Sequence, residues 1–280
     1  MAVTGLVLST VFLHLDETPR GVHERLSFFL TALASIFFVC ADELAVFTQE
    51  RPIYLRETMH NVYRWISYVL ANALVSFPRP VILSLVFAVT TFFPVGFAGG
   101  GVSFAFFSLL VLASMWAGTG LAMFLSAVVP LVMLAYTVMM AIVAYCVIFS
   151  GFFIHRDRIP TYWIWFHYIS LLKYPYQAAM QNEFSDATRC FMRGTQAFDA
   201  TPIGAMREAV KIEVLGAIST VISTNITVST CIVTGADVLT QHAVTDVGKW
   251  TCLLVTAMFG FFFRALFYVV LLARSKYQRR

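Results

Sequence analysis

Charged residues are scarce in this sequence. Asp, Glu, Lys and Arg make up only 12% of its 280 residues, whereas hydrophobic residues make up 59% and the mean hydropathy is +0.79. Soluble domains contain about 25% charged residues, so this composition excludes an ordinary water-soluble fold. Only helices and closed barrels cross a bilayer, because its core offers backbone groups no water to bind. The apolar runs here are long and continuous, which predicts an all-α integral membrane protein.

The residue patterns that enzymes and metal sites need are also missing. The six histidines are scattered and form none of the close pairs that a di-iron enzyme uses. The sequence contains no G-x-S-x-G elbow, no C-x-x-C pair and no G-x-x-x-x-G-K-[ST] phosphate loop. We therefore expect no catalytic residue, no metal and no ATP site within this chain. Its net charge of +4 is dispersed over loops and the C-terminal tip, which argues against a nucleic-acid partner.

Five cysteines are present, and their surroundings divide them into two groups. Cys40, Cys146 and Cys252 lie in apolar runs, where a buried, inert thiol is typical. Cys190 and Cys231 lie in the long polar segment and are the only plausible disulfide pair.

Hydropathy divides the chain into spans and connections. Residues 1–13 are apolar but shorter than the roughly 20 residues that a spanning helix needs. The predicted segments are a partial first helix at 1–13, helices at 26–47, 68–97, 102–123, 128–153 and 252–273, a charged segment at 48–65, a polar loop at 154–250 and a tail at 274–280. Proline at 78 and 80 predicts a bend in the third of these helices, and Arg79 between them either lines a polar pathway or extends toward an interface. Asp42 and Glu43 are expected at the membrane interface.

Charge also predicts the orientation of the spans. The basic residues of the tail belong in the cytoplasm by the positive-inside rule. Segment 48–65 is then cytoplasmic and segment 154–250 is external. The external segment contains both the cysteine pair and the sequon Asn225-Ile226-Thr227, a candidate glycosylation site at Asn225.

The stretch from residue 143 to 184 has the most distinctive sequence. It breaks after an apolar helix at Ser150-Gly151, continues through HRDR, and then carries the aromatic run YWIWFHY, which is typical of a bilayer edge. FSGFF, RDRIP, KYP and QNEF in this stretch resemble the segment after the fifth transmembrane helix of plant half-size transporters of the ABC superfamily, G (white-brown) subfamily. The resemblance extends over the whole chain but covers only that family's membrane domain, and is greatest to the branch associated with export of suberin and cutin precursors.

The resemblance implies a six-helix ABC-2 type domain at the plasma membrane with a truncated first helix. It implies a homo- or heterodimer that exports hydrophobic compounds such as fatty acyl or alcohol wall precursors. ATP and Mg²⁺ would bind a nucleotide-binding domain that this chain lacks, so we expect a fragment, a truncated gene model or a shortened paralogue. Alternatively, the chain is a non-transporting paralogue that pairs with and regulates a complete half-transporter; a channel or secondary carrier is a weaker third hypothesis, because the sequence shows no inverted repeat.

Particular residues acquire roles from the same resemblance. Phe38 corresponds to a substrate-stacking ring, and Phe152 and Phe153 to an upper gate; packing or lipid-facing phenylalanines are the alternative for all three. The segment 48–65 corresponds to the helix that contacts the nucleotide-binding domain, and an ordinary interfacial loop is its alternative. The candidate coupling residues in it are Glu50, Arg51, Arg56 and Glu57.

Overall fold

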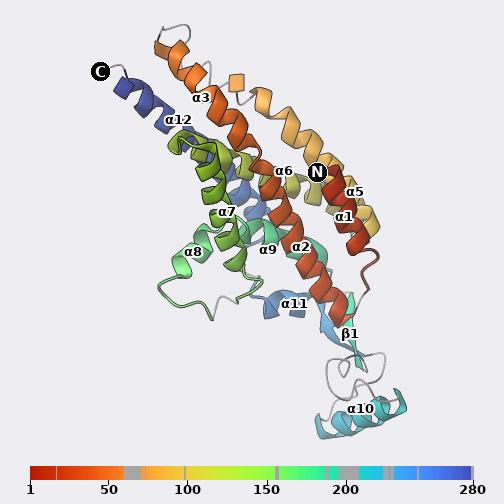
Figure 1. The fold of residues 1–280 in the computed structure, drawn as a ribbon. Coiled ribbons are helices and arrows are strands. Elements are labelled where there is room, and N and C mark those ends of the chain that lie inside the picture. Colours follow the sequence, from red (N-terminus) through yellow and green to blue (C-terminus); the bar gives the residue numbers. More distant parts are fainter. Residues whose placement is uncertain are drawn as a thin grey trace.

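The computed structural model is a bundle of long helices with a smaller folded segment at one end (Figure 1). It describes residues 1–16, 18–59, 71–72, 74–97, 99–154, 158–186, 189–194, 196, 208–222, 227, 230–244 and 246–278. The elements in chain order are α1 (Ala2–Val11), α2 (Pro19–Cys40), α3 (Glu43–Met59), α5 (Pro78–Val95), α6 (Gly100–Val128), α7 (Val132–Ile148), α8 (Ile164–Ile169), α9 (Lys173–Phe184), β1 (Cys190–Arg193), α10 (Glu208–Ile222), β2 (Cys231–Thr234), α11 (Gly235–Gln241) and α12 (Lys249–Gln278).

Four described stretches of helix are long and apolar enough to cross a membrane. They are Pro19–Ile53, Leu74–Val95, Gly100–Val128 and Lys249–Arg274. Two shorter apolar helices, α1 and α7, have 10 and 17 residues. The predicted all-α membrane fold is confirmed, although the described residues also include one two-stranded antiparallel ribbon, β1–β2.

The first long span differs from its predicted bounds of 26–47. Helix α2 begins at Pro19 because the Thr18 hydroxyl accepts a hydrogen bond from the Gly21 amide and proline occupies the first turn. The helix is interrupted at residues 41–42 and resumes as α3. The described part of segment 48–65 is therefore a continuation of this helix rather than a separate element, and residues 60–65 lie outside the described residues.

The later spans also differ from the predicted bounds, because local caps set their ends. Helix α5 begins at Pro78, after helical residues 74–76 and a bend at 77, so the predicted bend lies at its start. Helices α6 and α12 are longer than predicted at 102–123 and 252–273, and α12 continues through most of the predicted tail. Helix α7 is shorter than 128–153, because Pro130 precedes it and the Ser150-Gly151 turn follows it. The described part of the predicted loop 154–250 contains the four helices α8, α9, α10 and α11 and both strands.

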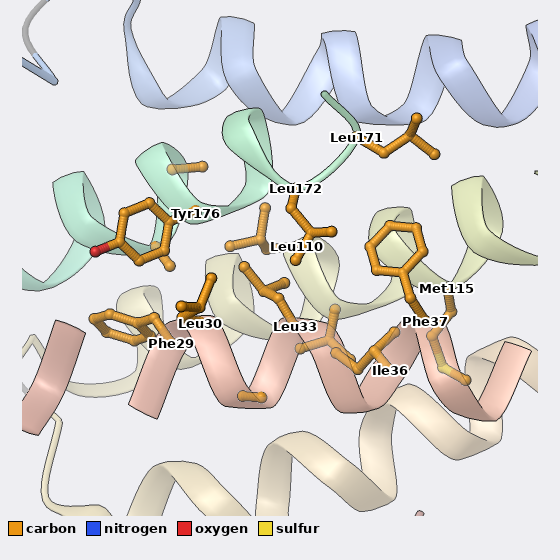
Figure 2. Close-up of a cluster of buried hydrophobic side chains, with 14 of the residues drawn as sticks. Phe29, Leu30, Leu33, Ile36, Phe37, Leu110, Met115, Leu171, Leu172 and Tyr176 are labelled. Atoms are coloured by element: carbon orange, nitrogen blue, oxygen red, sulfur yellow. The ribbon is translucent and has the colours of Figure 1, made fainter. Parts of the chain in front are cut away.

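The hydrophobic core lies where α2 and α6 meet the start of α9. Figure 2 shows Phe29, Leu33 and Phe37 of α2 directed toward Leu110 and Met115 of α6, with Leu171, Leu172 and Tyr176 on the α9 side. All eight of these side chains are at most 4% exposed. Helix α6 also contacts α3, α5, α7 and α12, so it is the central element of the bundle.

Helices α6 and α12 approach closely at two glycines. A Cβ at Gly120 would lie 2.9 Å from the Gly260 carbonyl oxygen, and a Cβ at Gly260 would overlap the Trp116 ring. Small residues at such a crossing allow two backbones to pack directly against each other in a membrane.

A substitution at this crossing should separate the two helices. We expect Gly260→Ala to lower the free energy of unfolding by about 1–3 kcal/mol, because the new methyl group overlaps the Trp116 ring. Thermal unfolding of the purified protein in detergent measures the change. Gly101→Ala is the matched control, since no atom lies within 4 Å of a Cβ at Gly101; equal melting temperatures for the two variants would contradict the close packing.

Candidate functional site

The last turn of α9 joins several distant parts of the chain, and we call residues 181–184 the α9 anchor. The Gln181 amide nitrogen donates to the carbonyl oxygens of Val244 and Val247, both at 2.6 Å, in the segment that leads into α12. The Asn182 amide nitrogen donates to the Ser103 carbonyl oxygen at 3.2 Å, in the first turns of α6. Two amide side chains thus attach the ends of α6 and α12 to α9.

Glu183 of the anchor lies in a buried ion pair with Arg25 of α2. The Glu183 and Arg25 side chains are only 2% and 1% exposed. Arg189 approaches the same carboxylate oxygen at 3.3 Å, and Arg25 also donates to the Leu15 carbonyl oxygen at 2.8 Å. Because an unpaired buried charge is costly, this carboxylate holds α2 and the chain after α9 in fixed positions.

Phe184 completes the α9 anchor. It is fully buried, and its ring contacts Phe191 of β1 with 5.0 Å between centroids. β1 pairs with β2, and a disulfide joins Cys190 to Cys231 across the ribbon. Thr234 begins α11, where its hydrogen bonds hold the pKa of Asp237 below its usual range. The other predicted feature of this region, the sequon at Asn225, lies outside the described residues.

Phe38, the predicted stacking ring, lies on the open face of α2. It is 48% exposed, whereas the neighbouring Phe37 and Ile36 are buried in the core at 1% and 0%. The helical phase of α2 therefore directs Phe38 away from its own bundle. This exposure argues against the alternative of a core-packing ring and leaves Phe38 open to lipid, to a ligand or to a second protein chain.

Phe152 and Phe153, the predicted gate, follow the turn that ends α7. Phe152 stacks on His23 of α2 with centroids 5.8 Å apart and meets the Tyr176 ring edge-on at 6.4 Å. Phe153 contacts Phe152 at 5.0 Å and is itself 61% exposed. Gly151, with φ of 100°, makes the turn possible because left-handed backbone favours glycine.

The structure does not bring all three phenylalanines together. His23, which contacts Phe152, lies 15 residues before Phe38 on α2. This separation corresponds to roughly 22 Å along a helix axis. Phe38 therefore lies at one level along α2, and the Phe152–Phe153 pair packs beside α2 at another.

The four predicted coupling residues lie on α3 and face different surroundings. Arg51 points into the bundle, where its guanidinium donates to the carbonyl oxygens of Ser126, Ala127 and Val129 at 3.0, 3.4 and 3.2 Å. These oxygens belong to the C-terminal end of α6, which has no helical donors left to satisfy them. Glu50 and Arg56 are exposed, and Glu57 is partly exposed.

A second arginine supports the same end of α6. Arg274 of α12 donates to the Val128 carbonyl oxygen at 2.8 Å. Helices α3 and α12 are thus both attached to the last turn of α6 by guanidinium groups.

Sequence reasoning missed two polar contacts between helices. Arg264, in the middle of α12, is 5% exposed, donates to the Trp116 carbonyl oxygen at 2.8 Å and to the Thr119 hydroxyl at 2.9 Å, and lies 3.3 Å from the centroid of the Trp116 ring. A lone arginine in an apolar run was the available signal. The second is the ion pair between Arg79 and Glu43, which settles neither the pathway nor the interface reading of Arg79.

These features define a multi-pass helical membrane protein with a folded, disulfide-linked segment before its last span. Residues 1–184 match the family model of the ABC-2 type transporter, and the chain belongs to this family as a membrane domain.

Plant ABC transporters of the G family are similar to this chain over its whole length. It is 56% identical over 278 residues to ABC transporter G family member 16 of Arabidopsis thaliana, 54% over 280 residues to member 1 of the same plant, and 56% over 278 residues to member 5 of Oryza sativa subsp. japonica. These matches cover 99%, 100% and 99% of the chain but only 38%, 38% and 35% of the relatives. The resemblance to plant ABC G transporters is confirmed, and the chain spans little more than a third of their length.

Removing one partner of the buried ion pair should destabilise the fold. We expect Glu183→Gln to cost about 3–5 kcal/mol, because Arg25 would remain buried without a counter-charge. Thermal unfolding in detergent measures this change, and Glu24→Gln, an exposed carboxylate beside Arg25 in sequence, is the control. An unchanged melting temperature for Glu183→Gln would show that the pair does not hold the fold.

Proposed function

We propose that this chain is the transmembrane part of an ATP-driven exporter of hydrophobic or lipidic compounds. The observation that carries the proposal is the family match over residues 1–184 together with at least 54% identity to three plant G family members. In this proposal ATP and Mg²⁺ bind a nucleotide-binding domain outside residues 1–280. The working unit is a homo- or heterodimer in the plasma membrane.

The exposed face of α2 supports a pathway between two copies. Phe38 on that face offers a flat apolar ring to a solute, and Phe152 and Phe153 at another level of the bundle offer an apolar plug. Such a plug excludes water and ions but can part for a hydrophobic solute. We infer that the substrates are long-chain fatty acyl or alcohol compounds of the kind that form suberin and cutin.

Coupling is assigned to α3. Glu50, Arg56 and Glu57 lie at or near its surface, where they can form ion pairs with an ATPase domain. Arg51 acts differently in this proposal, because its guanidinium is bonded to the end of α6. It would pass the displacement of α3 to the centre of the bundle.

Export of a labelled long-chain alcohol from sealed membrane vesicles tests the proposed function. A polypeptide that joins this domain to the ATPase domain should export the alcohol only with ATP and Mg²⁺, and residues 1–280 expressed alone should not. Export by residues 1–280 without ATP would overturn the proposal in favour of a carrier. Inhibition of a complete transporter by added residues 1–280, without export by the joined polypeptide, would favour a regulatory partner.

Removal of the Phe38 ring should weaken substrate binding. In the joined polypeptide we expect Phe38→Ala to lower export about 2–10-fold at low substrate concentration, which corresponds to the 0.5–1.5 kcal/mol of an aromatic contact. Surface expression should be unchanged, because the ring is 48% exposed. Phe93→Ala on α5, with a ring that is 65% exposed, is the control; equal export by the two variants would contradict a stacking role for Phe38.

Two arginines of α3 should give opposite results. We expect Arg56→Glu to leave the melting temperature unchanged while ATP hydrolysis continues without export, since the side chain is exposed. Arg51→Ala should lower the free energy of unfolding by about 1.5–3 kcal/mol for each strong hydrogen bond that is lost at the end of α6. ATPase and export assays on one preparation, with a thermal scan, measure both effects. If Arg56→Glu exports as much substrate per ATP hydrolysed as the unchanged protein, α3 has no coupling role and is an ordinary interfacial element.

A further inference from the structure

An apolar groove lies between α6 and α12, apart from the residues assigned to transport. Its volume is about 250 Å³, and every lining side chain is apolar: Phe77, Leu109, Leu112, Ala113, Trp116, Leu253, Ala257 and Phe261. Phe77, Leu109 and Phe261 at its rim are 46%, 47% and 57% exposed. The groove therefore opens to the hydrocarbon of the bilayer.

The lining residues form one straight stripe on each helix. On α12 they recur at intervals of four from Leu253 through Ala257 to Phe261. On α6 they include Leu109, Ala113 and Trp116, at intervals of four and three. These spacings place each set on a single helix face, so the groove runs along the helices instead of across them.

One further step along the two stripes reaches the end of the bundle, at the cation Lys249 on α12 and at the Phe106 ring on α6. Lys249, four residues before Leu253, begins α12. Its ammonium nitrogen lies 5.4 Å from the centroid of the Phe106 ring, three residues before Leu109 on α6. Trp250 contacts the same Phe106 ring at 5.1 Å and is 59% exposed. A lysine and an exposed tryptophan are typical of the level of lipid headgroups.

The length of the stripe matches one leaflet. Lys249 and Phe261 are 12 residues apart, which corresponds to about 18 Å of helix. Half of a bilayer's hydrocarbon core measures about 15 Å. The groove is lined from Leu253 to Phe261, and its stripe continued to Lys249 extends from the headgroup level to near the middle of the membrane.

The inner end of the groove is bounded by a packed cluster of rings. The Trp116 ring meets Phe77 and Phe261 edge-on, at 5.5 and 5.6 Å between centroids. The Arg264 guanidinium lies against the same indole at 3.3 Å, and the glycine crossing of α6 and α12 is directly beside it. The groove is therefore formed by the fold itself and does not depend on the ligand.

We propose that this groove binds one phospholipid of the adjacent leaflet, with its phosphate at Lys249 and one acyl chain along the stripes. The positive charge of Lys249 complements the phosphate, and the absence of polar lining side chains suits an acyl chain and no headgroup. This site is separate from the proposed transport pathway and does not rest on it.

Photolabelling of the intact chain in lipid nanodiscs tests the site. The probe is phosphatidylglycerol with a diazirine midway along one acyl chain, and peptide mass spectrometry maps the label. We expect labelling to concentrate on peptides that contain Leu109–Trp116 and Leu253–Phe261, well above the lipid-exposed Val89 and Phe93 of α5. If the groove peptides are labelled no more strongly than Val89 and Phe93 of α5, the proposal is overturned.

Two variants and a control separate the groove from general contact with lipid. Ala257→Phe fills the groove and should reduce its labelling to the α5 level. Leu254→Phe adds a ring at a position that is 63% exposed and absent from the lining, and should leave groove labelling unchanged. Lys249→Gln should lower groove labelling about fivefold, which corresponds to about 1 kcal/mol for one lysine at a phosphate.

Other occupants give distinct results. A sterol that carries a diazirine tests for a sterol site. If it labels the groove and prevents labelling by the phospholipid, the occupant is a sterol and the proposal is overturned. Leu112→Cys tests for a second copy of the chain: efficient disulfide cross-linking of two chains at this position would make the groove a protein interface. Equal labelling in Ala257→Phe and Leu254→Phe, with both variants monodisperse, would also refute a specific lipid site.

Discussion

Glu183 occupies an interior that is almost closed to water, and a carboxylate there needs opposite charge and hydrogen-bond donors close by. Arg25 and Arg189 supply both, and Arg25 also donates a hydrogen bond to the Leu15 carbonyl oxygen. A buried ion pair contributes little net stability compared with an apolar pair of the same shape, but it tolerates few alternative arrangements. The pair therefore determines where α2 begins relative to α9. Gln181 and Asn182 on the same turn do the same for α12 and α6.

Charges inside the bundle are used in a second way at the opposite end of α6. The last carbonyl groups of a helix have no donors within the helix, and hydrocarbon supplies none. Arg51 and Arg274 satisfy them from α3 and α12, and Arg264 satisfies the Trp116 carbonyl oxygen in the middle of the span. The described guanidiniums of α3 and α12 thus act largely as hydrogen-bond donors to α6. These arginines of the fold therefore join helices to one another.

Much of the fold could be predicted from the sequence, because hydrocarbon imposes long apolar helices and the composition is extreme. The helix ends could not, since Thr18, Pro130 and the Ser150-Gly151 turn set them by local geometry whatever the hydropathy. The candidate site was accessible only in part. Phe37 and Phe38 are adjacent phenylalanines, and the only sequence signal for the exposed one is weak: Ser27, Thr31 and Ser35 recur at helical spacing on the face that carries Phe38. Arg51 and Arg56 likewise differ in the direction they face, which a weakly amphipathic segment does not encode. QNEF was useful for the family resemblance, whereas its structural role requires partners up to 158 residues away.

The attachment of α3 and α12 to one turn of α6 has a mechanical consequence. Three helices that share one attachment point are restrained from sliding independently there, because Arg51 of α3 and Arg274 of α12 both bond to the last carbonyl oxygens of α6. At the other end of the bundle, α6 and α12 are held by two different side chains of α9, Asn182 and Gln181, so each of them has an attachment of its own there.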